Sequence, residues 1–237
     1  MIDLHSHILP GIDDGSPNLE TSIKMLQRAK SIGVTHIVFT PHLVSKSSYF
    51  TEKDKLKKIF DEFKDNVKDI GIKLYLGSEI YYSEKNYKKL LNGELVTFND
   101  SKVCLVEFPM HTESDIEETI YNIKVNGFTP ILAHPERYKF ISWEDVLSIK
   151  ENAFIQVNST SILGYHGKKV KKSVFELLKR QLVDFVASDT HNDEDRCVNL
   201  DQAYKIVKKK FCEEYADKIF VKNQEKLISI IDNEAIF

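Results

Sequence analysis

Short apolar, β-branched runs alternate along this chain with longer amphipathic stretches, and this alternation constrains the fold more than any other feature. The apolar runs are typical of strands and cover residues 2–4, 36–39, 74–76, 103–106, 131–133, 154–157 and 185–187. Helical spacing of apolar residues lies between them. Repeated strand–helix alternation predicts parallel strands joined by right-handed crossovers.

The first helix is expected at about residues 17–32. Ser16 is the expected N-cap, and Gly33 is expected to stop the helix. Its apolar stripe would consist of Leu19, Ile23 and Leu26.

Residues of the kinds that bind metals follow almost all of the apolar runs. They are His5, His7, Asp14, His42, Glu79, Glu107, His134, Asp189 and His191. The carboxyl ends of parallel strands meet at one mouth in a barrel, whereas an open sheet would scatter these residues along an edge. Six of the seven expected strands carry such a residue at that end, which favours a closed barrel. All the donors are nitrogen or oxygen, a set that suits a hydrolytic centre holding Mn, Fe or Zn rather than a structural cysteine–zinc site.

Each of these residues, taken singly, also has a simpler explanation. A stray His-x-His pair is common, Asp14 lies in a turn-like loop, and Glu79 or Glu107 alone could be a surface charge. A separate explanation for every one of them is improbable, so we interpret them as one site. The remaining histidines do not follow strand ends consistently and are interpreted as non-ligands: His36, His111 and His166.

Composition narrows the class of protein. A chain of 237 residues with 42% hydrophobic content is expected to form one domain over residues 1–237. A formal net charge of −3 gives no electrostatic case for binding nucleic acid or an anionic membrane. No apolar run approaches the roughly 18 residues of a membrane span, so no membrane insertion is expected. With no leader before the first His pair and three cysteines without a C-x-x-C pattern, a cytoplasmic protein free of disulfides is expected.

Several longer motifs carry a resemblance to a known family. They are DLHSHILPGIDDG (residues 3–15), TPH (40–42), EFP (107–109), HPER (134–137) and ASDTHN (187–192). The set of metal-type residues resembles the PHP (polymerase and histidinol phosphatase) superfamily. The motifs together resemble its bacterial manganese-dependent protein-tyrosine phosphatases, which are encoded with capsule and exopolysaccharide genes. The resemblance covers nearly the whole chain in order and implies a distorted (β/α)7 TIM-like barrel, in agreement with the strand count.

This resemblance also implies how the metals are held. Up to three divalent ions are expected, with Mn²⁺ first and Fe, Zn, Mg or Co as alternatives. One position would use Asp14, His42 and His191, the second His5, His7, Glu79 and Asp189, and the third Glu79, Glu107 and His134. Glu79 would then bridge two of the positions.

The implied activity is hydrolysis of phosphotyrosine by a metal-bound hydroxide, on a protein substrate that we expect to be a bacterial tyrosine kinase regulating capsule or exopolysaccharide synthesis. The expected catalytic residues are Arg137, Arg196, His42 and Asp189. Arg137 would grip phosphoryl oxygens, and Arg196 would contact phosphate or assist the leaving group, unless it is only a surface charge. Aromatic candidates to flank the substrate ring are Phe108, Tyr138 and Phe140, for which packing is the alternative. The sequence is compatible with an oligomer.

Other functions are less consistent with these motifs. A cysteine-dependent tyrosine phosphatase needs an arginine six positions after its cysteine, and the residues at those positions are Met110, Ala203 and Lys218. The opening loop and the HPER run argue against another PHP phosphoesterase such as a histidinol phosphatase. No polymerase domain or basic groove supports a PHP nuclease. A non-catalytic scaffold that docks a kinase would have no chemical need for the complete ligand set.

Overall fold

Parallel strands and helices alternate through the computed structural model, which describes residues 1–45 and 47–234. The strands are β1 (Ile2–Asp3), β2 (His36–Phe39), β3 (His42–Leu43), β4 (Lys73–Leu76), β5 (Glu79–Tyr81), β6 (Val103–Glu107), β7 (Thr129–Ala133), β8 (Phe154–Asn158) and β9 (Phe185–Ala187). The α-helices are α1 (Leu19–Ser31), α2 (Lys53–Val67), α3 (Glu84–Leu91), α4 (Ile116–Val125), α5 (Trp143–Ile149), α6 (Ser159–Leu163), α7 (Gly167–Lys179), α8 (Leu200–Lys210), α9 (Glu213–Asp217) and α10 (Asn223–Glu234). Shorter helical turns are η1 (Lys68–Ile70), η2 (Phe98–Asp100), η3 (Pro135–Arg137) and the π-helix η4 (Lys218–Lys222).

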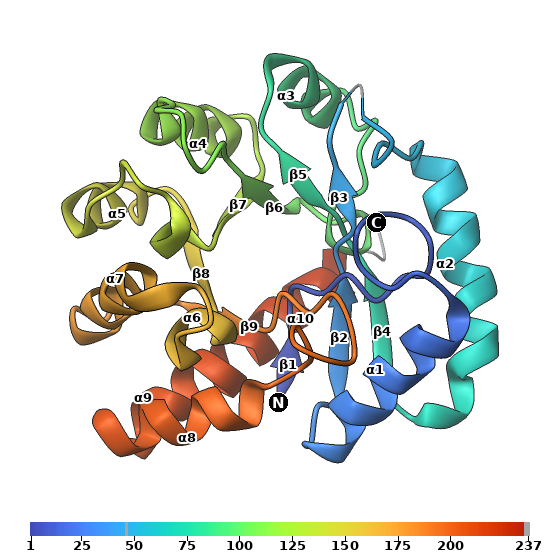
Figure 1. The fold of residues 1–237 in the computed structure, drawn as a ribbon. Helices are drawn as coiled ribbons and strands as arrows, with labels where there is room; N and C mark the ends of the chain where they lie inside the picture. Colours follow the sequence, from blue (N-terminus) through green and yellow to red (C-terminus); the bar gives the residue numbers. More distant parts are fainter. Residues whose placement is uncertain (46, 235–237) are drawn as a thin grey trace.

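The strands form a distorted closed barrel. One sheet has the order β1-β2-β4 and the other the order β3-β5-β6-β7-β8-β9, with every pairing parallel. Because β3 follows β2 and β5 follows β4 across two-residue breaks, the described strands occupy seven positions. The ring closes where the backbone N–H of His7 donates to the carbonyl of Thr190 at 2.9 Å and that of Asp189 to the carbonyl of His5 at 3.0 Å. Figure 1 shows the helices arranged around the strands. The expected (β/α)7 barrel is confirmed.

The break between β4 and β5 contains Gly77, where the backbone lies close to two side chains. A Cβ atom at this position would lie 2.6 Å from the ring of Phe98 and 3.2 Å from the side chain of Val38, so only glycine fits. All seven expected strands are present, whereas β3 and β5 were not predicted. These two strands have only two and three residues, too few for an apolar pattern to reveal them.

The first helix begins later than the sequence predicted. Asn18, not Ser16, is the N-cap, because its side chain accepts from the N–H of Thr21 at 2.9 Å. The Ser16 hydroxyl instead donates to the Asn18 carbonyl. The predicted stripe was also partly wrong, since Leu19 is 39% exposed. The helix buries Ser22, Met25, Leu26 and Ala29. Gly33 follows the helix in a left-handed conformation, as a stop requires.

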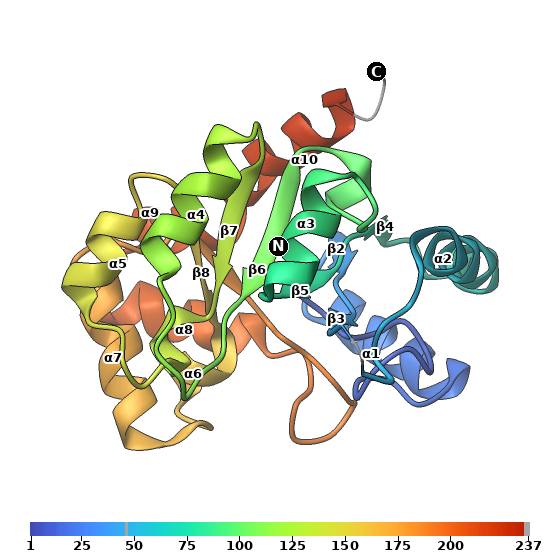
Figure 2. The ribbon, with the colours of Figure 1, turned by 90° about the horizontal axis from the view of Figure 1, so that it is seen from above.

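The barrel interior is apolar at one end and polar at the other. Leu4, Val38, Leu105 and Phe185 belong to an inner cluster that α10 joins through Leu227, Ile228 and Ile231. Figure 2 shows α10 at one end of the strands and the loop between β9 and α8 at the other. Since side chains alternate along a strand, positions two residues beyond the inward apolar ones face inward at the carboxyl ends. None of the helices in the described part of the chain is long and apolar enough to cross a membrane.

Candidate metal centre

All of the metal-type residues singled out from the sequence meet at the carboxyl ends of the strands. His5 and His7 follow β1, His42 begins β3, Glu79 begins β5 and Glu107 ends β6. The others lie in connecting segments, with Asp14 in the loop before α1, His134 directly after β7, and Asp189 and His191 after β9. Glu107 faces inward because it is two residues beyond Leu105 on the same strand. The geometry of the strands brings these side chains together, as the strand–helix alternation of the sequence predicted. Their role as metal ligands stays a prediction.

Among the described residues there are four overlapping sets, and within each set the donor atoms all lie within 4.8 Å of one another. The sets are His7, Asp14, His42 and His191; His5, Glu79 and His134; His5, His7 and Asp189; and His42, Glu79 and Glu107. Glu79 joins them, since its Oε1 lies 2.9 Å from His134 Nε2 and its Oε2 lies 2.8 Å from His42 Nδ1. A shared carboxylate of this kind suits a centre that holds several ions. The partition into three positions remains a prediction, because Glu79 groups with His5 as well as with Glu107.

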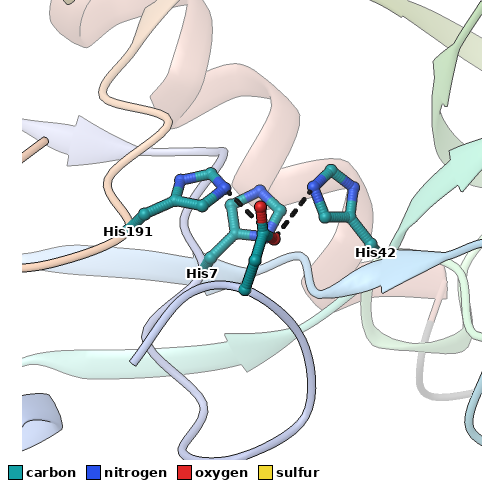
Figure 3. Close-up of side chains that lie close together, drawn as sticks. His7, His42 and His191 are labelled. Carbon is teal, nitrogen blue, oxygen red and sulfur yellow. Dashed lines mark ion pairs between the residues drawn. The ribbon is translucent and has the colours of Figure 1, made fainter. Parts of the chain in front are cut away.

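Three imidazoles converge on one carboxylate at the mouth. Figure 3 shows His7, His42 and His191 pointing toward one another. The Oδ1 atom of Asp14 lies 3.4 Å from His42 Nε2 and 3.6 Å from His191 Nε2. The rings of His7 and His191 stack with centroids 3.9 Å apart. These three imidazoles lie close together around the Asp14 carboxylate, which is 43% exposed. They form a concave set of possible metal ligands that is open to the cavity.

The backbone is strained at two of these residues. His134 has φ of +33° and Asp189 has φ of +52°, a left-handed conformation that residues other than glycine rarely adopt. Each such residue costs roughly 1–3 kcal/mol, and strain of this kind clusters at functional sites. Both residues directly follow or nearly follow a strand end, where the sharp turn keeps their side chains buried in the cluster.

Charges in the cluster are poorly balanced by the protein alone. Burial, together with the nearby carboxylates of Glu79 and Asp189, raises the pKa of Glu107 to about 9. Burial also disfavours the carboxylate of Glu79, but the surrounding His5 and His42 outweigh this effect and hold its pKa well below the ordinary value. Burial lowers the pKa of His134, which therefore stays neutral and keeps a lone pair for a ligand.

Buried polar atoms without partners test whether metals fit this cluster. His42 Nδ1, Glu79 Oε2 and His191 Nε2 are buried and make no hydrogen bond among the described residues, although the first two lie 2.8 Å apart. Leaving such atoms unpaired is costly, whereas divalent cations held by the donor sets to which these residues belong would give them partners. The donors are imidazole nitrogens and carboxylate oxygens, which suit Mn, Fe or Zn. The residues present therefore fit a cluster of divalent metals.

The cluster forms the floor of a cavity of about 270 Å³. Its wall contains Val44, Tyr49, Tyr81, Met110, Arg137 and Arg196. Both arginines face Asp189 Oδ2, with Arg137 Nη1 at 3.2 Å and Arg196 Nη2 at 3.5 Å. Two guanidinium groups at the edge of a metal-type cluster can hold an anion there.

The aromatic residues proposed from the sequence do not line this cavity. Phe108 is fully buried, and Tyr138 is 4% exposed. The Tyr138 hydroxyl donates to the carbonyl of Ala133 at 2.9 Å and accepts from the N–H of Phe108 at 2.9 Å, so it braces the backbone. Phe140 stacks on Tyr138 and packs against the core. These three residues are packing residues, and Tyr49 and Tyr81 are the aromatic residues at the cavity.

Sequence reasoning missed three polar residues behind the cluster. Asp13 accepts a hydrogen bond from His7 Nδ1 at 2.7 Å, and Gln156 Oε1 lies 3.0 Å from His5 Nδ1. Asn158 donates to Asp189 Oδ2 at 2.6 Å. Gln156 and Asn158 are two residues apart on β8, and this spacing was a usable signal that both face the barrel interior. The histidines interpreted as non-ligands, namely His36, His111 and His166, lie outside all four sets.

Comparisons with known proteins agree on one family. The family model described as "Capsular polysaccharide synthesis, CpsB/CapC" matches residues 1–229. The chain is 35% identical to the tyrosine-protein phosphatase CpsB of Streptococcus pneumoniae over 240 residues, covering 96% of this chain and 98% of that protein. It is 32% identical to the tyrosine-protein phosphatase YwqE of Bacillus subtilis over 243 residues, covering 100% of this chain and 94% of that protein.

Comparison with solved structures supports the same family. A chain from crystal structures of YwqE from Bacillus subtilis and CpsB from Streptococcus pneumoniae, described as unique metal-dependent tyrosine phosphatases, superposes with a TM-score of 0.89. It is 30% identical, and the match covers all of this chain and 96% of that one. A histidinol phosphate phosphatase from Lactococcus lactis has a TM-score of 0.60 at 13% identity, with coverage of 90% and 95%, and therefore shares the fold alone. The chain belongs to the CpsB/CapC family of capsular polysaccharide synthesis.

Proposed function

We propose that this protein is a metal-dependent protein-tyrosine phosphatase that acts in capsule or exopolysaccharide synthesis. The observation that carries the proposal is the convergence of the metal-type side chains beneath two arginines at the mouth of the barrel. Relatives named tyrosine-protein phosphatases, alignable along almost the whole chain, support the reaction class. The cluster combines residues from His5 to His191, which supports our proposal that residues 1–237 form one phosphatase domain.

The metal-type residues would hold up to three divalent ions, with Mn²⁺ as our first choice. Divalent ions in such a site supply Lewis acidity, activate water at neutral pH and offset charge on phosphoryl oxygens. The four carboxylates of the set bring four negative charges when ionised: Asp14, Glu79, Glu107 and Asp189. Three divalent ions would leave the centre near +2, which matches a dianionic phosphomonoester.

The two arginines would hold and orient the phosphoryl group. Arg137 and Arg196 both reach the same oxygen of Asp189 from the cavity side, so their remaining N–H groups can donate to phosphoryl oxygens. Arg137 is the more enclosed, with a side chain that is 20% exposed against 34% for Arg196. We therefore assign phosphate binding to Arg137 and contact with the phosphate or the departing phenolate to Arg196. His42 and Asp189 complete the proposed catalytic set as donors to the metals.

The cavity wall favours an aromatic ester. Tyr49 lies against His42, with ring centroids 6.2 Å apart and an interplanar angle of 24°. Together with Tyr81, Val44 and Met110 it gives an apolar rim above a charged floor. A phosphotyrosyl side chain has the same division, with an apolar ring and a dianionic end. A phenol of pKa about 10 also leaves with less acid assistance than an alkyl alcohol.

We further propose that the protein substrate is a bacterial tyrosine kinase and that the enzyme works in the cytoplasm. The capsule family supports the first proposal. The second is supported by the cysteines, since Cys104, Cys197 and Cys212 are all free.

Hydrolysis of a phosphotyrosyl peptide by metal-stripped protein tests this proposal. Turnover should return when Mn²⁺ is added and disappear with EDTA, and histidinol phosphate should remain uncleaved. Cleavage of histidinol phosphate alone would move the protein to a different phosphoesterase class. Cleavage of neither compound by the fully metal-loaded protein would favour a scaffold without catalysis.

A further inference from the structure

Asp13 contacts two of the residues that we assign to the metals, His7 and His42. Both of its carboxylate oxygens already accept hydrogen bonds. Its side chain is fully buried. Oδ2 accepts from His7 Nδ1 at 2.7 Å and from the backbone N–H of His42 at 2.9 Å, while Oδ1 accepts from the N–H of Gly15 at 3.0 Å. One carboxylate thereby ties together the segment that follows β1, the start of β3 and the loop that carries Asp14.

The bond from His7 determines which ring nitrogen is free. If Nδ1 carries the proton that it donates to Asp13, Nε2 keeps its lone pair. That Nε2 atom lies 3.2 Å from His5 Nε2 and 3.4 Å from Asp189 Oδ1, inside the cluster. Asp13 is thus placed to hold His7 in the tautomer that a metal requires.

His5 is oriented in a similar way, but by a neutral side chain instead of a carboxylate. Its Nδ1 faces Gln156 Oε1 at 3.0 Å, and Gln156 in turn donates to Asn158, which donates to Asp189. His5 is therefore oriented by an amide, whereas His7 is oriented by a carboxylate. A carboxylate partner raises the basicity of a ligating imidazole as well as fixing its orientation.

We propose that Asp13 is a positioning residue that fixes the tautomer and orientation of His7 and holds the Asp14 loop in register with His42, thereby setting the metal affinity of the centre. The inference rests on the proposed metal centre. We give Asp13 no ligand role, because it belongs to none of the four donor sets and its two oxygens already accept three N–H groups. It acts through His7 and through the backbone.

Asp13→Asn is the sharpest variant, because it preserves the shape of the side chain. An amide has one oxygen for three donors, so its NH₂ group must face at least one N–H, and the negative charge is lost. We expect metal dissociation constants to rise about 10- to 100-fold, the range typical of such supporting residues. The matched control is Asp115→Asn, which makes the same change at an exposed loop aspartate that also accepts from a backbone N–H, that of Glu118.

The experiment is competition for Mn²⁺ between the protein and a fluorescent chelator, with the melting temperature of the metal-free protein measured alongside. The expected result is weakened affinity in Asp13→Asn alone, with metal-free melting close to wild type and turnover recovering at saturating Mn²⁺. Affinity within about twofold of wild type would overturn the inference while leaving the metal centre intact. Failure of wild-type protein to bind Mn²⁺ would instead overturn the proposed function and this inference with it.

A second measurement needs no variant. The tautomer of His7 can be read from its ring nitrogen shifts in wild-type protein loaded with diamagnetic Zn²⁺. We expect a protonated Nδ1 and a metal-bound Nε2. A protonated Nε2 would refute the positioning role even if Asp13→Asn failed to fold.

Discussion

Gly15→Ala tests how closely the Asp13–Asp14 loop must lie over His7. A Cβ atom on Gly15 would lie 2.1 Å from the carbonyl oxygen of His7 and 2.5 Å from its Cβ, distances that real Cβ atoms essentially never show. Ordinary contact begins at 3.4 Å, so one side must move by at least about 1.3 Å. Only glycine at position 15 allows the loop to lie this close to His7.

We expect the loop to be the side that moves. His7 is fully buried, and its N–H donates to Thr190 across the barrel closure at 2.9 Å. The displaced loop would carry away Asp14, whose carboxylate lies 3.4 Å from His42 Nε2. A misplacement of about 1 Å at a catalytic constellation costs on the order of 10²-fold in rate. We therefore expect kcat/KM to fall about 100-fold, with weaker Mn²⁺ binding.

The assay combines phosphotyrosyl peptide hydrolysis, Mn²⁺ affinity and thermal melting of the metal-free protein. Gly127→Ala is the control for backbone strain, because Gly127 has φ of +86° and a Cβ there would meet nothing within 4 Å. It lies beyond the end of α4 and should cost about 1–2 kcal/mol of stability without changing activity. If Gly15→Ala keeps kcat/KM and Mn²⁺ affinity within about threefold of wild type, the reasoning from loop position is refuted.

Three further predictions concern the cavity and the cluster. Arg137→Ala should lower kcat/KM about 10²- to 10³-fold with bound metal unchanged by elemental analysis, and parallel loss of metal would contradict a phosphate-binding role. Tyr49→Ala should raise KM for a phosphotyrosyl peptide about two- to tenfold but leave KM for a small alkyl phosphate unchanged, because only the aromatic ester contacts the rim. Equal effects on both esters would exclude that contact. Glu107 has a folded-state pKa of about 9, so it holds its proton at neutral pH and must release it to ligate. Mn²⁺ affinity should therefore rise by up to tenfold per pH unit up to about pH 9, and chelator competition should show a shallower rise in Glu107→Gln.

The same pKa determines the sign of the effect of Glu107 on stability. Its folded-state pKa lies above the ordinary value of 4.5, so the proton stabilises the metal-free fold below that value. This contribution is lost as the pH rises toward about 9. Bound cations should reverse the trend, because they favour the ionised carboxylate.

The strand framework was predictable because fully buried parallel strands leave continuous apolar runs. β2 and β9 have the bounds expected from the sequence. β3 and β5 escaped prediction because they have only two and three residues, and the break before β5 contains Gly77, whose close approach to Phe98 is a tertiary contact. The cap of α1 was wrong for a similar reason, since two polar residues precede the helix and only hydrogen bonding in the fold distinguishes Ser16 from Asn18.

Convergence of the metal-type residues was also predictable, because each follows a strand and parallel strands end together. Of the cavity wall, Arg137 and Arg196 were expected from the sequence, but the aromatic residues were not, since Tyr49 lies in a loop and Tyr81 belongs to an unpredicted strand. Phe108 and Tyr138 looked suitable in the sequence because they adjoin the motifs, yet they point into the packing layer. A residue next to one of these motifs lies near a strand end, but its position in the sequence does not indicate which way its side chain points.

The most direct test of the central claim is phosphate release from a phosphotyrosyl peptide, followed as Mn²⁺ is added in steps to metal-stripped protein with bound metal counted in the same samples. We predict that turnover rises as the cluster fills, reaches its maximum with more than one ion bound and is abolished by EDTA. Turnover that is undiminished in metal-stripped protein would contradict the account.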